Sequence, residues 1–141
     1  MQILCVLLCT FFCASTMCLT QTMKEIEEFE KDFYPFLSAP KNDSLATIML
    51  MKSSKSVVVC QCARAQLKLT REYLKETGDP SSTQVKKMLA TLDALIRKTI
   101  SDPLKEDKCE FNGWVPWKTK KLFKSFFKRY NEDDCSQESN K

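Results

Sequence analysis

Apolar side chains recur at helical spacing in four segments of the chain. The first segment runs from residue 22 to about residue 37, and acidic side chains occupy its opposite face. The second covers residues 57–76. The third extends from a cap at Ser81 or Ser82 to about residue 100, and the fourth begins at Pro116. This periodicity predicts four amphipathic helices. The apolar face of the fourth helix would consist of Leu122, Phe123, Phe126, Phe127 and Tyr130.

Connections of unequal length join these helices. Residues 41–56 and 104–115 form long connections, of which residues 104–115 are expected to be a loop. Gly78 and Pro80 mark a short turn, with glycine just past a helix end. Residues 45–51 are apolar and partly β-branched, which predicts a short strand packed across the helices. Two long crossovers around one short turn predict an all-α, short-chain up-up-down-down four-helix bundle with a strand between its first two helices.

The first 20 residues form a segment of their own. They contain no charged side chain and include an apolar run of about 12 residues, shorter than the roughly 20 that a membrane span needs. We therefore expect residues 1–20 to be a signal peptide and residues 21–141 to be one secreted domain. Cleavage would follow Ser15 or Thr20, and a retained membrane anchor is the alternative. In a secreted chain, Asn42 lies in a glycosylation sequon.

Four of the eight cysteines lie in this leader. The other four would form two disulfides in an oxidising compartment, and sequence spacing leaves all three connectivities open. These four are Cys60, Cys62, Cys109 and Cys135.

Composition argues against an enzyme. The chain contains no histidine, so histidine-based catalytic triads and histidine metal sites are absent, and its two glycines cannot form a glycine-rich phosphate loop. We expect no cofactor and no metal. A net charge of +4 is too small to indicate nucleic acid by itself.

Several short segments, taken in order, resemble the interleukin-4/interleukin-13 family of cytokines. Residues 22–26 resemble the start of that family's first helix, and residues 45–48 with the following Lys/Ser-rich link resemble its strand and loop. Residues 62–65 resemble the start of its second helix. Cys109 and Cys135 flank the fourth helix where the family places cysteines.

The resemblance implies a secreted, monomeric cytokine that bridges two type I receptor chains. These would be an interleukin-4 receptor α-like chain and a common γ or interleukin-13 receptor α1-like chain, with Janus kinase and STAT activation and type 2 immune output. It implies a pairing of Cys62 with Cys109, which leaves Cys60 to Cys135. The implied receptor-binding residues are Glu25 with Arg97 or Lys98 for the α chain, and Lys128, Arg129 and Tyr130 for the second chain.

Other interpretations stay open from the sequence. The charged residues are equally compatible with solvated helix faces, and Tyr130 fits the apolar stripe, in which case Lys121, Lys124 and Lys128 carry the outward face. An interleukin-2/15/21-type cytokine is one alternative. A cationic host-defence protein that acts on membranes through its fourth helix is another, because such basic amphipathic segments bind membranes or sulfated glycans. Weak glycan binding is a further expectation.

Overall fold

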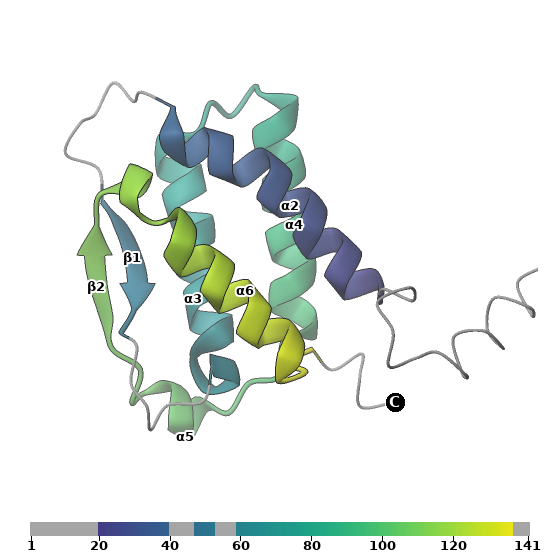
Figure 1. Ribbon diagram of the computed structural model, residues 1–141, viewed down its shortest axis with the longest axis vertical. Coiled ribbons are helices and arrows are strands. Elements are labelled where there is room, and N and C mark those ends of the chain that lie inside the picture. Colours follow the sequence, from purple (N-terminus) through teal and green to yellow (C-terminus); the bar gives the residue numbers. More distant parts are fainter. Residues whose placement is uncertain (1–19, 40–46, 53–58, 137–141) are drawn as a thin grey trace, which may run out of the picture.

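The computed structural model describes residues 20–39, 47–52 and 59–136. Residues 1–19 of the predicted signal peptide, Asn42 and the C-terminal residues 137–141 lie outside these ranges. Figure 1 shows the arrangement, in which α2 and α6 lie in front of α3 and α4, and a two-stranded sheet flanks α3. In chain order the elements are α2 (Gln21–Ser38), β1 (Ile48–Met51), α3 (Val59–Thr77), α4 (Thr83–Lys98), α5 (Pro103–Glu106), β2 (Phe111–Trp114), the 3-10 helix η1 (Pro116–Lys118) and α6 (Lys120–Glu132).

The four predicted amphipathic helices are confirmed as α2, α3, α4 and α6, with small differences at their ends. Thr20 caps α2 by accepting a hydrogen bond from the Met23 amide, and Ser82 caps α4 by accepting one from Val85. Helix α2 continues through Pro35 to Ser38. Pro116 begins η1, so the fourth long helix starts later, at Lys120.

An aromatic seam holds α2 against α6. The rings of Phe33 and Phe123 meet edge to face with centroids 5.0 Å apart, and Phe29 meets Phe127 in the same way at 5.8 Å. All four side chains are at most 2 % exposed. Such edge-to-face pairs stabilise by about 0.5–1.5 kcal/mol beyond the burial of their area. The apolar face of α6 is therefore used in the core.

The connection between α4 and α6 is more structured than a loop. The expectation that residues 104–115 form a loop was wrong, because they contain most of α5 and all of β2. Strand β2 pairs antiparallel with β1, so that Ile48 lies opposite Trp114 and Met51 opposite Phe111. The predicted strand at residues 45–51 is present as β1, at Ile48–Met51. Its partner depends on a pairing between distant residues, which local periodicity does not report.

Gln66 attaches the sheet to α3. This side chain is fully buried, accepts a hydrogen bond from the Met51 amide at 2.7 Å and donates one to the Met49 carbonyl at 2.9 Å. It thereby satisfies backbone groups on the edge of β1 that face the helix, which would be costly to bury without partners. The polar residue in the apolar stripe of α3 thus docks the sheet on the bundle.

Two disulfides join α3 to segments that lie later in the chain. Cys62 is bonded to Cys109 and Cys60 to Cys135, the pairing that the family resemblance implied. One bond fixes the segment between α5 and β2, and the other fixes the chain just after α6. The described residues thus form a small helical bundle with a short antiparallel sheet and two disulfides. Among these residues, no helix is long and apolar enough to cross a bilayer.

Gly78 follows α3 for a reason other than the one expected. Its backbone does not adopt the left-handed conformation that usually favours glycine after a helix. A Cβ atom here would instead lie 2.7 Å from the Leu74 carbonyl oxygen and 2.9 Å from Val85 Cγ1. The close approach of α4 to the end of α3 therefore requires a residue without a side chain.

We expect Gly78→Ala to destabilise the protein by about 1–3 kcal/mol, because the added methyl group must displace backbone or a buried valine. Chemical unfolding followed by circular dichroism measures this change. Gly113→Ala is the control, since its Cβ would lie 3.4 Å or more from its nearest neighbours, an ordinary van der Waals separation. Equal stability of the two variants would contradict the steric explanation.

Candidate functional site

The first candidate site lies where α2 begins and α4 ends. Lys98 Nζ lies 2.9 Å from Glu25 Oε1 and donates a hydrogen bond to Thr22 Oγ1 at 3.2 Å. The side chains of Glu25 and Lys98 are only 21 % and 23 % exposed. We call the contact between Glu25, Lys98 and Thr22 the clasp. It brings together two of the residues that the resemblance implied, from segments more than 70 positions apart.

The structure also separates the two basic residues that sequence alone left as alternatives. Lys98 turns toward α2, whereas Arg97 is exposed on α4, and no ion pair among the described residues involves it. Neighbouring residues of a helix point about 100° apart, so only one of the two can reach Glu25. Any role of the clasp therefore rests on Lys98.

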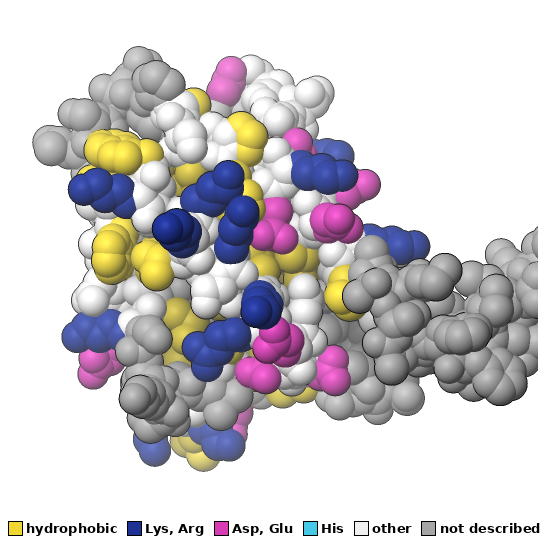
Figure 2. Space-filling view, in the orientation of Figure 1, with side chains coloured by type: hydrophobic (Ala, Val, Ile, Leu, Met, Phe, Trp, Pro, Cys, Tyr) yellow, Lys and Arg dark blue, Asp and Glu magenta, His cyan; other side chains and the backbone are white. Residues whose placement is uncertain are grey.

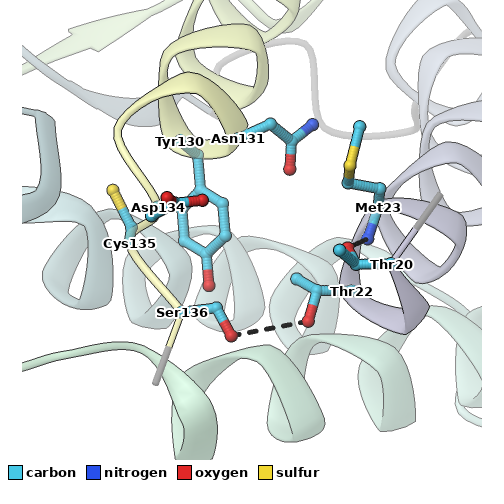
Figure 3. A pocket seen from close by; sticks show the side chains of 8 residues that line it. All are labelled: Thr20, Thr22, Met23, Tyr130, Asn131, Asp134, Cys135 and Ser136. Carbon is cyan, nitrogen blue, oxygen red and sulfur yellow. Dashed lines mark hydrogen bonds between the residues drawn. The ribbon is translucent and has the colours of Figure 1, made fainter. Parts of the chain in front are cut away.

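Polar contacts extend the clasp toward the C-terminal end. The hydroxyl groups of Thr22 and Ser136 lie 3.4 Å apart, and they border a small pocket of about 80 Å³ between α2 and the turn after α6 (Figure 3). Ser136 also forms a β-bridge with Thr99, and the Ile100 amide donates to the Cys135 carbonyl. The start of α2, the end of α4 and the residues after α6 are thus joined at one pole of the bundle.

Tyr130 belongs to this pole and to the core. It is 1 % exposed, and its hydroxyl oxygen lies 2.8 Å from Thr99 Oγ1. The periodicity that placed Tyr130 in the apolar stripe is therefore confirmed. Its ring is not available on the free surface, so a partner binding to α6 would contact other residues.

Lys128 and Arg129 lie on the accessible sides of α6. Lys128 is exposed and lies 3.9 Å from Glu132, a separation at which an exposed ion pair contributes little. Arg129 is half-buried and borders a groove of about 430 Å³ between α6 and the sheet. Of these two basic residues of α6, Lys128 is therefore exposed to solvent, and Arg129 borders the groove.

Two apolar residues beside this groove are exposed rather than packed in the core. Trp114 on β2 is 41 % exposed and Leu122 on α6 is 40 % exposed, and both line the groove with Phe126. Placing Leu122 in the apolar face of the core was therefore wrong. The buried face of α6 begins one residue later, at Phe123, whereas Leu122 lines the groove beside the sheet. Figure 2 shows apolar side chains on this side of the molecule beside basic side chains over α6.

Two residues of α2, Glu30 and Tyr34, have pKa values raised by burial. Burial raises the pKa of Glu30, while the hydrogen bond from the Tyr34 hydroxyl and the charge of Lys124 act in the opposite direction. Burial, followed by the hydrogen bond to Glu30, raises the pKa of Tyr34. The charge of Lys124 therefore favours the ionised form of Glu30.

The described residues contain no group of three or more cysteine, aspartate or glutamate side chains placed to hold a metal ion. Comparisons with protein-family models, with curated proteins and with solved structures found no match for the chain.

We expect the clasp to stabilise the fold measurably. A double-mutant cycle of Glu25→Gln and Lys98→Met should give a coupling energy of about 1 kcal/mol, because the pair is mostly shielded from water and its members touch. Urea unfolding of the four proteins measures it. The cycle of Glu25→Gln with Arg97→Met is the control, and a coupling of similar size there would show that Arg97 shares the contact.

Proposed function

We propose that this protein is a secreted cytokine of the interleukin-4/interleukin-13 type that signals by bringing two type I receptor chains together. The observation that carries the proposal is the 2.9 Å contact between Glu25 and Lys98. The residues that the resemblance assigns to the receptor α chain lie in different helices, and they meet at one place on the surface. Two disulfides support an extracellular location, because such bonds persist in oxidising compartments.

The finer topology of the proposal is an up-up-down-down bundle. Strands β1 and β2 belong to the two long connections and pair with each other, so the described parts of both connections lie together beside α3 (Figure 1). The α3–α4 connection is short, and these helices pack closely, as expected for antiparallel neighbours. Both features support the cytokine arrangement.

The first receptor-binding surface would centre on the clasp. Glu25 and Lys98 remain partly exposed, so a receptor can reach their charged groups without separating them. A receptor that covers the clasp would exclude water from the pair and strengthen its electrostatic interactions. Glu25 would then act as a pre-oriented carboxylate, because Lys98 already fixes its side chain.

The second surface would be formed by Lys128 and Arg129. Tyr130 would support it from the core, through its contact with Thr99. The groove beside Arg129 offers a partner exposed apolar surface on Trp114 and Leu122, next to a guanidinium group. Aromatic and arginine side chains of this kind often supply most of the binding energy of an interface.

A membrane-active cationic protein is less well supported. Such helices insert an apolar face between lipid headgroups. The three phenylalanines of α6, which would form that face, are at most 6 % exposed because they pack in the core. A short-chain cytokine of the interleukin-2/15/21 type has the same bundle and would share the bridging mechanism.

A charge exchange tests the first surface. Glu25→Lys alone should abolish binding of the α chain and signalling, but it also places two lysines in contact. The double variant Glu25→Lys/Lys98→Glu restores an ion pair with the charges exchanged, so it should keep its helicity and thermal stability and still fail to bind. Surface plasmon resonance with the receptor ectodomain and a STAT reporter assay measure the result.

The same two helices provide a matched control. Glu28 and Lys87 lie 3.5 Å apart on α2 and α4, at a more exposed position. Glu28→Lys/Lys87→Glu exchanges charges in the same manner and should leave binding within about threefold of the original protein, as for most peripheral charges. Full binding by the folded Glu25→Lys/Lys98→Glu variant would remove the clasp from the receptor-binding surface.

Arg129→Glu should leave binding of the first chain unchanged and weaken recruitment of the second chain by roughly tenfold or more, because it reverses a charge beside an apolar groove. A ternary binding assay with the first ectodomain immobilised separates the two steps. Lys86→Glu, an exposed site on α4, is the charge-matched control. Loss of both binding steps in Arg129→Glu would indicate misfolding or a single shared surface.

A further inference from the structure

A row of basic side chains lies along the outer side of α6 and the η1 turn before it. Residues 118–129 contain six basic side chains and no acidic one. Five of the six are exposed, and the dark side chains over α6 in Figure 2 lie along this face. We call these five residues the basic row; they are Lys118, Lys120, Lys121, Lys124 and Lys128.

The basic row is unfavourable for the helix that carries it. Lys120 and Lys121 occupy the first turn of α6, which contains no acidic residue, although the N-terminus of a helix favours negative charge. Lys120 and Lys124, and Lys124 and Lys128, are like charges four positions apart, a spacing that destabilises helices. Local sequence that opposes its own secondary structure is expected where a surface serves binding.

Acidic neighbours only partly offset this charge. Glu132 Oε1 lies 3.9 Å from Lys128 Nζ at the C-terminal end of the row, and the charge of Lys124 lowers the pKa of Glu30 on α2. Lys120 lies over the ring of Tyr34, with 5.7 Å between its Nζ and the ring centroid. Among the described residues, Lys118, Lys121 and Lys124 form none of the ion pairs found in the structure.

The chemistry of the surface points to a linear polyanion. Successive lysines extend along about 12 Å of helix from Lys120 to Lys128, which suits repeated anionic groups on a chain rather than a single small anion. Lys side chains bind sulfate and phosphate groups as flexible point charges. Trp117, which is 58 % exposed, precedes the row and offers a flat ring against which a sugar can pack.

An anionic membrane is a weaker fit for the same surface. Peripheral helices combine a basic side with an apolar side that enters the lipid, and here Phe123, Phe126 and Phe127 are turned into the core. The two disulfides are those of a protein exposed to oxidising surroundings, where sulfated polysaccharides are the abundant linear polyanions.

We propose that the basic row binds a sulfated polysaccharide, so that this protein is retained on sulfated glycans outside the cell. The site differs from the clasp and reaches the proposed second receptor surface only at Lys128. Bound glycan would reduce the repulsion among the lysines and would therefore stabilise α6.

The test uses heparin as the probe and the intact disulfide-bonded protein. The triple variant Lys118→Gln/Lys121→Gln/Lys124→Gln avoids Lys128, which belongs to the proposed receptor surface, and Lys120, which contacts Tyr34. We expect its heparin affinity at physiological salt to fall roughly tenfold or more, with a shallower dependence of affinity on salt, because fewer counterions are released. Isothermal titration calorimetry at several salt concentrations measures both quantities.

A control of equal charge is available on the other helices. Lys68→Gln/Lys75→Gln/Lys86→Gln removes three exposed lysines from α3 and α4, so the net charge falls by the same amount. The proposal expects this variant to bind heparin as the original protein does. Equal losses in the two triple variants would show that net charge alone attracts heparin and would overturn the assignment to α6.

Thermal stability supplies an independent measurement. Heparin should raise the melting temperature of the original protein and of the control variant, but much less that of the α6 variant. Without heparin, the α6 variant should melt close to the original protein, because the like-charge repulsion that is removed offsets the lost attraction between Lys124 and Glu30. A marked drop would mean that these lysines stabilise the fold, and it would contradict the proposal.

Three further probes test the class of ligand. Desulfated heparin should bind at least about tenfold more weakly than heparin, because sulfate groups carry the recognised charge. Vesicles of phosphatidylserine and phosphatidylcholine, and double-stranded DNA, should bind more weakly than heparin at the same salt concentration. Failure to bind heparin at physiological salt, or tighter binding to vesicles or DNA, would overturn the proposal.

Discussion

The aromatic contact between α2 and α6 determines which side chains of α6 are exposed. Because Phe123 and Phe127 pack against Phe33 and Phe29, the rotation of α6 about its axis is fixed. That rotation buries Tyr130 and turns Lys121, Lys124 and Lys128 toward solvent. Four rings buried in the core thus decide which residues of α6 are accessible to a partner. The same packing commits the apolar face of the helix to the core, and so disfavours a mechanism based on lipid insertion.

A second constraint acts at the pole where the clasp lies. The end of α4 meets the start of α2 through Lys98, and it meets the residues after α6 through Thr99, which contacts both Tyr130 and Ser136. The Cys60–Cys135 disulfide joins the same residues to α3. Segments from both ends of the folded domain are therefore held next to the charged pair proposed to bind the first receptor chain. This arrangement keeps Glu25 in one position before binding, which reduces the entropy lost on association.

The sequence was sufficient for features that depend on local periodicity and insufficient for those that depend on distant partners. The spacing of phenylalanines located α6 and favoured the burial of Tyr130. The sequence did not indicate strand β2, because its residues Phe111–Trp114 do not alternate between apolar and polar. Its pairing with β1 also joins residues about 60 positions apart. The sequence could not decide whether Arg97 or Lys98 is the basic partner of Glu25, because an approximate resemblance does not fix the alignment to within one position. The sequence correctly placed Gly78 after α3. Glycine is required there because Val85 of α4 lies close to its Cα, and only the packing of the helices reveals this contact.

The cap at the start of α2 would depend on where the signal peptide expected from the sequence is cleaved. Thr20 accepts the Met23 amide through its side chain and the Lys24 amide through its carbonyl. Proteolysis immediately after Thr20 would delete both acceptors and leave a positively charged amino group at the positive end of the helix dipole, close to Thr22. Proteolysis after Ser15 would retain the capping residue and place the new amino group five residues away. The geometry of Thr20 thus predicts a better-capped α2 in a chain that begins after Ser15 than in one that begins after Thr20.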